Sequence, residues 1–283
     1  MAQFTNQAAI SYNGITVNSN IVTGEITEAL RITKNAVTEL YRTDDTVTYV
    51  IALQNTGASA YTDLTVTDDL GAYPFGGGTV TPLTFTGEDV LYYVDGVLQP
   101  APTVTQGPPL VITGIRVPAN GDTILVYRAR VNAFAPLGED ATVTNTATAS
   151  GGGLVETPSD SAVITAGTAS RLTILKALSP TTVVDNEEIT YTFTIENYGT
   201  EADESASVIL SDTFNPILNT PLTVTLNGAP LVATDYTYSE ESGAFATIPG
   251  VITVPAATYT QDESTGAWSV TPGVTVVTVS GTV

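Results

Sequence analysis

The chain has 283 residues, 42% of them hydrophobic, and its 29 acidic residues outnumber its eight basic ones. The formal net charge of -21 repels anionic polymers and surfaces, so we expect neither nucleic acid nor a membrane among its partners. Cysteine and histidine are both absent, which excludes disulfides, thiol nucleophiles, histidine-based triads and ordinary zinc sites. We therefore predict a protein that is not an enzyme and that needs no cofactor or metal.

The residue pattern predicts an all-β fold. Threonine and valine dominate, glycine and proline recur between short alternating runs, and helical periodicity is nearly absent. No apolar run approaches the ~20 residues that a membrane helix requires. The length suggests two domains, each large enough for a core of its own.

After an N-terminal segment, the expected strands fall into two series in chain order. The first series covers residues 29–35, 46–54, 62–68, 90–94, 110–117, 122–132, 141–149 and 159–165. The second series covers residues 171–177, 188–196, 206–212, 222–226, 247–254 and 273–283. Turn signals such as Asp95-Gly96 and Asn227-Gly228 separate the runs. Short antiparallel strands in this number are typical of immunoglobulin-like β-sandwiches, so we predict two of them in tandem.

An internal repeat supports this division. Residues 30–57 align without a gap on residues 172–199, and residues 124–131 correspond to residues 276–283. We place the boundaries at residues 1–26 for an N-terminal arm, 27–166 for the first sandwich and 169–283 for the second.

The first copy of the repeat contains a hairpin that the second copy lacks. That hairpin covers residues 143–166, and the other segment that resembles it is the arm, residues 4–26. We therefore expect a second domain that is incomplete on its own and an arm that supplies the missing strands. On the face expected to make contact, the arm carries Phe4, Asn6, Ala8 and Ile10, at the positions of Val143, Asn145, Ala147 and Ala149.

Three placements of the arm are open: an extra strand on its own domain, closure onto the second domain of the same molecule, or insertion into a neighbouring copy. An arm tethered at residue 27 would have to reach across both domains to close the molecule on itself. We favour insertion into a neighbour, because strand addition is an established recognition mode. A head-to-tail contact of this kind gives an open chain of identical subunits.

The two lysines of the chain, Lys34 and Lys176, occupy equivalent positions of the repeat. Both alternate in phase with apolar residues of their strands, as in Leu30, Ile32 and Lys34, so both are expected to point inward. Asp68, Asp212, Asn145 and Asn6 share this inward phase in their own strands. Because a buried ammonium is costly unless it is paired or neutralised, we expect these groups to meet.

Two arrangements fit such a cluster. One is a buried ion pair between lysine and aspartate, with the asparagine as a hydrogen-bond partner. The other is an isopeptide crosslink, formed when a neutral lysine amine attacks the asparagine amide and the aspartic acid shuttles protons. The crosslink would join Lys34 to Asn145 with Asp68 in the first domain. In the second it would join Lys176, with Asp212, to Asn6 of the neighbouring subunit.

Other sites are weakly indicated. Acid-rich turns such as 185–188 lack the ligand spacing of a calcium loop, and solvated turns explain them better. A surface adhesin or ligand-binding module is the main alternative, for which Tyr92, Tyr93 and Trp268 are scattered candidates. Residues 257–272, which hold that tryptophan, are expected to form a longer hairpin.

Several short motifs of the chain resemble a bacterial surface repeat family called domain of unknown function eleven. In the first copy they are Lys34, Thr48-Tyr49, Asn55, Gly57, Val66-Thr67-Asp68 and Thr144-Asn145-Thr146-Ala147. In the second copy they are Lys176, Thr190-Tyr191, Asn197, Gly199 and Leu210-Ser211-Asp212, with Thr5-Asn6-Gln7-Ala8 in the arm. The resemblance implies immunoglobulin-like domains of cell-surface and fibrous proteins.

The expected function is therefore structural. We predict a subunit of an extracellular filament, on a cell or spore surface, that polymerises by donor-strand complementation. The spore assignment follows the analogy with clostridial endospore appendages, because no secretory signal or wall anchor is recognisable.

Overall fold

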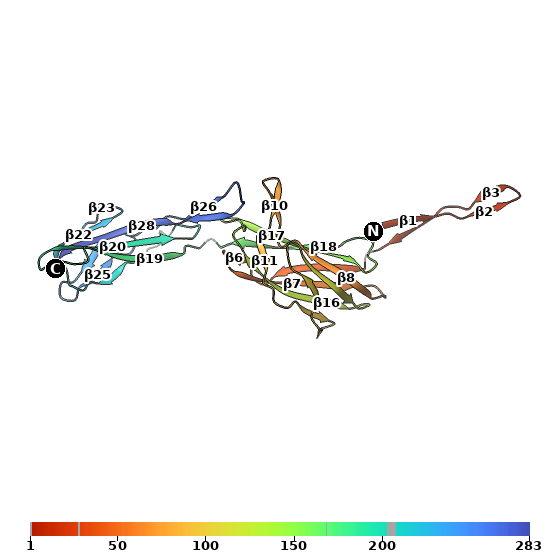
Figure 1. Ribbon diagram of the computed structural model, residues 1–283, viewed down its shortest axis with the longest axis horizontal. Coiled ribbons are helices and arrows are strands. Elements are labelled where there is room, and N and C mark those ends of the chain that lie inside the picture. Colours follow the sequence, from red (N-terminus) through yellow and green to blue (C-terminus); the bar gives the residue numbers. More distant parts are fainter. Residues whose placement is uncertain (1, 28, 168, 203–207) are drawn as a thin grey trace. The chain divides into compact units, whose positions relative to one another are not determined.

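The structure is a computed structural model that describes residues 2–27, 29–167, 169–202 and 208–283. It contains two compact units (Figure 1). Unit 1 comprises Met1–Ala135 and Thr142–Thr165, and unit 2 comprises Pro136–Ala141 and Ala166–Val283. All regular elements of the described residues are antiparallel β-strands, which confirms the predicted all-β class.

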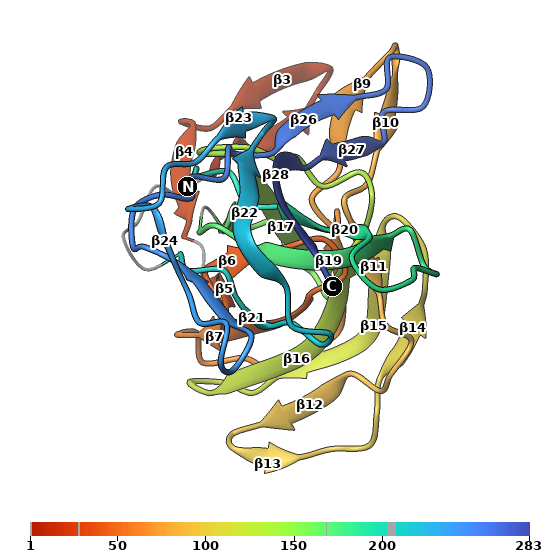
Figure 2. The same ribbon diagram turned by 90° about the vertical axis from the view of Figure 1, so that its left-hand side faces the viewer.

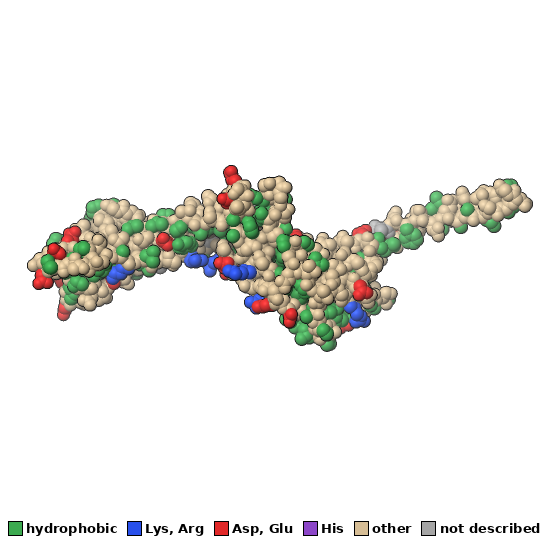
Figure 3. Space-filling view, viewed as in Figure 1, with side chains coloured by type: hydrophobic (Ala, Val, Ile, Leu, Met, Phe, Trp, Pro, Cys, Tyr) green, Lys and Arg blue, Asp and Glu red, His purple; other side chains and the backbone are tan. Residues whose placement is uncertain are grey.

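The N-terminal arm is a long hairpin with a separate pairing at its tip. Strand β1 (Ala2–Asn6) pairs with β4 (Val22–Ile26), and β2 (Ala9–Tyr12) pairs with β3 (Ile15–Asn18). The tip turn is Asn13-Gly14, and both residues have positive φ (47° and 79°), as a two-residue type I′ hairpin turn requires. Apolar side chains lie on the surface along this hairpin, with no core of their own (Figure 3).

The first sheet of unit 1 has the order β13-β12-β16-β7-β5, and β11 also pairs with β16. Its strands are β5 (Leu30–Ala36), β7 (Thr46–Asn55), β11 (Leu83–Phe85), β12 (Leu91–Val94), β13 (Val97–Leu98) and β16 (Asp122–Val131). Figure 2 shows β16, β12 and β13 in succession toward one edge. Alternate residues of β7 and β16 are buried, so one face of this sheet forms half of the core.

The second sheet of unit 1 has the order β14-β15-β8-β17-β18-β6. Its strands are β6 (Leu40–Tyr41), β8 (Tyr61–Asp68), β14 (Thr103–Thr105), β15 (Leu110–Val117), β17 (Thr142–Gly151) and β18 (Ser159–Ala166). A small additional hairpin joins β9 (Tyr73–Phe75) and β10 (Gly78–Val80). Strand β8 is central, because it pairs with β15 on one side and with β17 on the other.

Unit 2 repeats the main strand order of the first sheet as β19-β20-β28-β22-β23, and its described residues have no counterpart of β11 in this sheet. Its strands are β19 (Leu172–Ser179), β20 (Glu188–Asn197), β22 (Asn219–Leu226), β23 (Ala229–Pro230) and β28 (Gly273–Thr282). The other sheet has three strands in the order β21-β25-β24: β21 (Ser211–Thr213), β24 (Tyr236–Tyr238) and β25 (Ala244–Thr247). Strands β26 (Thr258–Gln261) and β27 (Trp268–Thr271) form the hairpin expected over residues 257–272.

The alignment of the two copies holds at the level of strand register. Leu30 lies opposite Asn55 across β5 and β7, and Leu172 lies opposite Asn197 across β19 and β20. The strand predicted at 247–254 is wrong: β25 ends at Thr247, and Ile252 and Val254 enter the core from an irregular segment. The strand predicted at 206–212 lies partly outside the described residues, and the pairing begins at Ser211.

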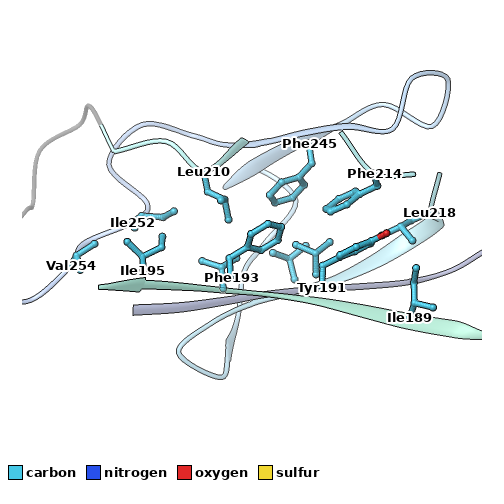
Figure 4. Packing of buried hydrophobic residues seen from close by; sticks show 13 residues of the cluster. Ile189, Tyr191, Phe193, Ile195, Leu210, Phe214, Leu218, Phe245, Ile252 and Val254 are labelled. Carbon is cyan, nitrogen blue, oxygen red and sulfur yellow. The ribbon is translucent and has the colours of Figure 1, made fainter. Parts of the chain in front are cut away.

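The core of unit 2 is built around aromatic rings between its two sheets (Figure 4). Phe214 is buried, and its ring centroid lies 4.8 Å from that of Tyr191 and 5.6 Å from that of Phe245. Unit 2 therefore has a packed core although one of its sheets is small. In the described part of the chain, no helix is long and apolar enough to cross a membrane.

We expect Phe214→Ala to lower the free energy of unfolding of unit 2 by about 3–5 kcal/mol, because it empties a packed aromatic site. Trp268 is the single tryptophan and lies in unit 2, so its fluorescence during urea denaturation reports on this unit. The exposed Val232→Ala serves as the control and should change stability by less than about 0.5 kcal/mol. Equal effects of the two changes would contradict the described core.

Candidate functional site

A fully buried lysine lies in the interior of unit 1. The Lys34 side chain is 0% exposed, and its Nζ lies 2.5 Å from Oδ2 of Asp68, which is equally buried. Lys34 comes from β5 and Asp68 from β8, so the ion pair connects the two sheets across the core. Burial lowers the pKa of Lys34, and the negative charge of Asp68 acts in the opposite direction.

Asn145 belongs to the same buried cluster. It lies on β17, two residues from Ala147, which is opposite Asp68 in the register of β17 and β8. The two side chains are therefore inward-facing neighbours on adjacent strands. The structure brings all three predicted residues of the first domain, Lys34, Asp68 and Asn145, into one dry cluster.

Tyr127 on β16 links the aspartate to the asparagine. Its hydroxyl donates a hydrogen bond to Asp68 Oδ2 at 2.6 Å and accepts one from Asn145 Nδ2 at 3.1 Å. Burial, followed by the charge of Asp68, raises the pKa of Tyr127 well above its usual range, so the phenol keeps its proton. The phenol therefore holds the amide nitrogen of Asn145 in place.

One buried acceptor of the cluster is unused. Among the described residues, Asn145 Oδ1 and the Tyr49 hydroxyl are buried and form no hydrogen bond of normal geometry. The Asn145 side chain nevertheless lies close enough to lower the pKa of Tyr49, against the larger raising effect of burial. An unmatched buried polar group costs about 1–3 kcal/mol, so the unsatisfied amide oxygen of Asn145 requires an explanation.

The sequence alone did not point to Tyr127. The alternation of β16 places this residue inward between Leu125 and Ala129, where a phenol needs a hydrogen-bond partner. Its register partner is Tyr49, and the two rings stack at 5.5 Å. An inward tyrosine in an alternating strand was the available signal, and only the fold shows which groups its hydroxyl joins.

The second lysine forms the equivalent ion pair in a more open setting. Lys176 Nζ contacts Asp212 Oδ2, and the two side chains are 42% and 18% exposed. The lysine also lies over the Tyr191 ring, 4.6 Å from its centroid. The position of Tyr127 is occupied by Val279 in the repeat, so unit 2 has no phenol at this point. Asn6, the predicted partner of Lys176, is exposed on β1.

The open setting results from an unpaired sheet edge. In unit 1, β8 has β17 as a neighbour, whereas in the described part of unit 2 the corresponding β21 pairs with β25 alone. In unit 1 the hairpin of β17 and β18 also closes the edge of β5, because the Lys34 backbone nitrogen donates to Asp160 Oδ2 at 2.7 Å.

Strand β19 shows the consequence for apolar surface. Leu30 and Ile32 of β5 are 3% and 5% exposed, whereas their counterparts Leu172 and Ile174 are 36% and 54% exposed. A cavity of about 270 Å³ opens there, and we call it the unit 2 pocket. Its lining residues are Leu172, Thr173, Ile174, Ile195, Val208, Ile209, Leu210 and Ser211.

The arm has the strand register of the hairpin that covers this region in unit 1. Asn6 lies opposite Val22 as Asn145 lies opposite Ala162, and Phe4 lies opposite Gly24 as Val143 lies opposite Ile164. The predicted contact residues Phe4, Asn6, Ala8 and Ile10 are all exposed on the arm. The Phe4 ring covers Gly24. The large and small residues of this pair thus stand where unit 1 has two residues of medium size, Val143 and Ile164.

The aromatic residues considered for ligand binding do not form an exposed cluster. Tyr92 is buried, and its hydroxyl accepts a hydrogen bond from the Arg116 backbone nitrogen at 2.9 Å. Trp268 lies in the other unit, in the hairpin of β26 and β27. The described residues also contain no group of three or more acidic, histidine or cysteine side chains that could hold a metal ion.

No family model matches the chain, and no curated protein matches it in sequence, so the resemblance to domain of unknown function eleven rests on its short motifs alone. Among solved structures, the chain is similar to BcpA, the major pilin subunit of Bacillus cereus, with 12% identity and a TM-score of 0.35 over 96% of this chain and 73% of that one. It is also similar to a fragment of the major pilin GBS80 of Streptococcus agalactiae, with 12% identity and a TM-score of 0.36 over 78% and 79% of the two chains.

A third similar structure is the collagen-binding domain of a Staphylococcus aureus adhesin, at 13% identity and a TM-score of 0.30, covering 50% of this chain and 99% of that one. All three TM-scores are below 0.5, so nothing about the function of this chain follows from them.

The two ion pairs should respond differently to loss of the carboxylate. We expect Asp68→Asn to destabilise unit 1 by about 3–5 kcal/mol, because it leaves a buried amine without its partner. Asp212→Asn should cost less than about 1 kcal/mol, since Lys176 is solvated. Urea denaturation followed by circular dichroism measures both, and an equal loss at the two positions would contradict the difference in burial.

Proposed function

We propose that this protein is the structural subunit of an extracellular filament, in which the arm of one copy completes unit 2 of the next. One observation carries the proposal: β21 has an unpaired edge where β8 has β17, and the arm reproduces the register of the hairpin that contains β17. The protein so defined is a self-polymerising subunit with no enzymatic turnover.

Exposed apolar side chains on unit 2 and on the arm provide the free energy for insertion of the arm. Full burial of a leucine or isoleucine contributes about 1.5–3 kcal/mol, and both Leu172 and Ile174 lie open. The arm offers matching apolar groups, since Phe4 and Ile10 are 52% and 65% exposed. Strand pairing with β21 would add main-chain hydrogen bonds along an edge that water now solvates.

The same geometry explains an open chain rather than a closed dimer. The donor surface lies on the arm and the acceptor surface on unit 2, so the contact joins two different surfaces. Each added copy then presents a new donor and a new acceptor. Contacts of this heterologous type continue indefinitely unless the rotation between copies closes a ring.

The buried cluster of unit 1 supports an intramolecular isopeptide bond between Lys34 and Asn145. The ammonium first transfers a proton to Asp68, which leaves a neutral amine and a carboxylic acid. The amine lone pair attacks Cγ of Asn145, and the acid protonates Oδ1, the acceptor that now lacks a partner. The Cγ–Nδ2 bond then breaks, and Nδ2 leaves as ammonia with a proton from the lysine nitrogen. Oδ1 returns its proton to the Asp68 carboxylate as the C=O bond of the new amide re-forms.

The same chemistry would lock the joints of the filament. The arm, seated in the register of β17, places Asn6 at the position of Asn145, beside the pair of Lys176 and Asp212. Insertion would also cover Lys176, and desolvation favours the neutral amine that the attack requires. Lys176 therefore becomes reactive when the arm of a neighbouring copy covers it.

Placement of the filament outside the cell, on a cell or spore surface, accords with these features. A covalent amide stabilises a β-sandwich where the chain has no cysteine for disulfides. The strongly negative net charge opposes lateral clumping of copies. The short motifs shared with domain of unknown function eleven point to the same class of surface protein.

Deletion of residues 2–26 should abolish polymerisation, because it removes the donor and leaves the sandwich sheets of both units intact. Electron microscopy and size-exclusion chromatography of the purified protein provide the measurement. As a matched control, Leu98→Ala changes an exposed apolar residue outside the arm and should leave the filaments unchanged. Filaments formed by the deletion variant would disprove arm exchange, and a parent chain that stays monomeric would disprove the function itself.

Bond formation should remove one ammonia per crosslink, which intact-mass measurement detects. We expect tandem mass spectrometry to find Lys34 joined to Asn145 within a chain and Lys176 joined to Asn6 between chains. Lys34→Met should abolish the first linkage and spare the second. Asn35→Asp, at an exposed site beside Lys34, is the control. An unmodified mass, together with filaments that dissociate to monomers in hot detergent, would disprove the crosslinks. The lysine clusters would then be ion pairs only.

A further inference from the structure

The tip of the arm differs in size from the tip of the hairpin that it replaces. In unit 1, Ala149 lies opposite Val66 and Gly151 lies opposite Leu64, so very small residues cover this end of β8. At the equivalent places the arm carries Ile10 and Tyr12. Their cross-strand partners are Val17 and Ile15, which adds two more exposed apolar side chains to the same face.

Unit 2 has a pocket at the counterparts of these β8 residues. The cavity of unit 1 along β5 is lined by residues 158–160 of the hairpin and by neither Leu64 nor Val66. In the repeat, Val66 and Leu64 correspond to Leu210 and Val208, and both line the unit 2 pocket. The pocket floor includes Ile195 from β20, which Figure 4 shows beside Leu210 in the core. An arm in the register of β17 would bring Ile10 opposite Leu210, at the opening of this cavity.

The backbone of unit 1 leaves no room for the side chains that the arm carries at its tip. Gly151 has a φ of +77°, a conformation that a tyrosine at this place would adopt only with strain. A Cβ at Gly152 would lie 2.7 Å from the Thr62 carbonyl oxygen and from Leu64 Cδ2. The arm has Tyr12 and Asn13 at these two places.

The other end of the hairpin adds a second mismatch. Val143 Cγ1 lies 2.6 Å from the position of a Cβ on Gly71, so the side chain at this site already touches the turn after β8. Phe4 of the arm would need room for a ring there. The arm thus fails to fit unit 1 at both ends.

We infer that residues 9–18, the arm tip, are a size-selective anchor that enters the unit 2 pocket of a second copy and is excluded from unit 1. Ile10 is the specificity-determining residue. The inference rests on the proposed function. It explains why the arm inserts into unit 2 and not into unit 1: the arm cannot displace the hairpin of β17 and β18 from unit 1. Donor and acceptor are therefore never confused, although the two units share one fold.

The test uses the full chain with Lys176→Met, so that no covalent bond hides the strength of the joint. Subunit exchange between two differently labelled filament samples gives the dissociation rate. Ile10→Ala, which restores the residue type of Ala149, should raise this rate about 100-fold, because a filled cavity is emptied. Leu98→Ala, which shortens an exposed apolar side chain outside the arm, should leave the rate unchanged.

The decisive measurement exchanges the sizes of the two contacting side chains, one in the pocket and one in the arm. Val208→Phe should fill the pocket and weaken joints made by the parent arm, and Ile10→Ala on that background should restore them. If Ile10→Ala exchanges like the parent while deletion of residues 2–26 still abolishes filaments, the anchor is disproved and the proposed function stands. With Lys176 present, a linkage from Asn6 to Lys34 would likewise overturn the exclusion from unit 1.

Discussion

A β-sandwich requires that each sheet cover the inner face of the other and that each buried strand edge find a partner. Unit 1 meets this requirement through β17 and β18, which extend its second sheet beside β8 and close over β5. Unit 2 keeps the strand order of the first sheet and a packed aromatic core, yet its second sheet stops at β21 in the described residues. The exposed leucine and isoleucine of β19, the solvated Lys176 and the pocket beside Leu210 all follow from that one unpaired edge.

The two lysine clusters show how burial decides chemistry. The same pair of residue types occurs twice, but Lys34 is sealed between two sheets and Lys176 is open on one side. Unit 1 also contains Tyr127, which holds Asn145 by its amide nitrogen, whereas Val279 takes that place in unit 2. In the proposed crosslinking, the cluster of unit 1 needs no second chain, because its three residues already meet within one fold. The cluster of unit 2 is completed by a second chain, and Lys176 stays open to solvent until that chain covers it.

Much of this architecture was predictable from the residues. The alternation around Lys34, Asp68 and Asn145 placed all three inward, and the gapless repeat gave the matching register of β5 and β19. Tyr127 could not be found in this way, because its role depends on which strand of the opposite sheet it faces. The strand expected at 247–254 failed since Ile252 and Val254 reach the core from an irregular segment with at most an isolated bridge, at Val254. Apolar alternation alone does not distinguish such a segment from a strand. The unit 2 pocket could not be predicted either, because it forms where the described part of unit 2 has no counterpart of β17 and β18.

The position of Lys34 has a mechanical consequence. It lies in β5, the first strand after the arm, and Asn145 lies in β17, in the hairpin that leads to unit 2. With the proposed amide between them, tension that enters through the arm and leaves toward unit 2 passes along covalent bonds alone. The strands between these two residues then carry no load, and a pulled filament transmits force without unravelling unit 1.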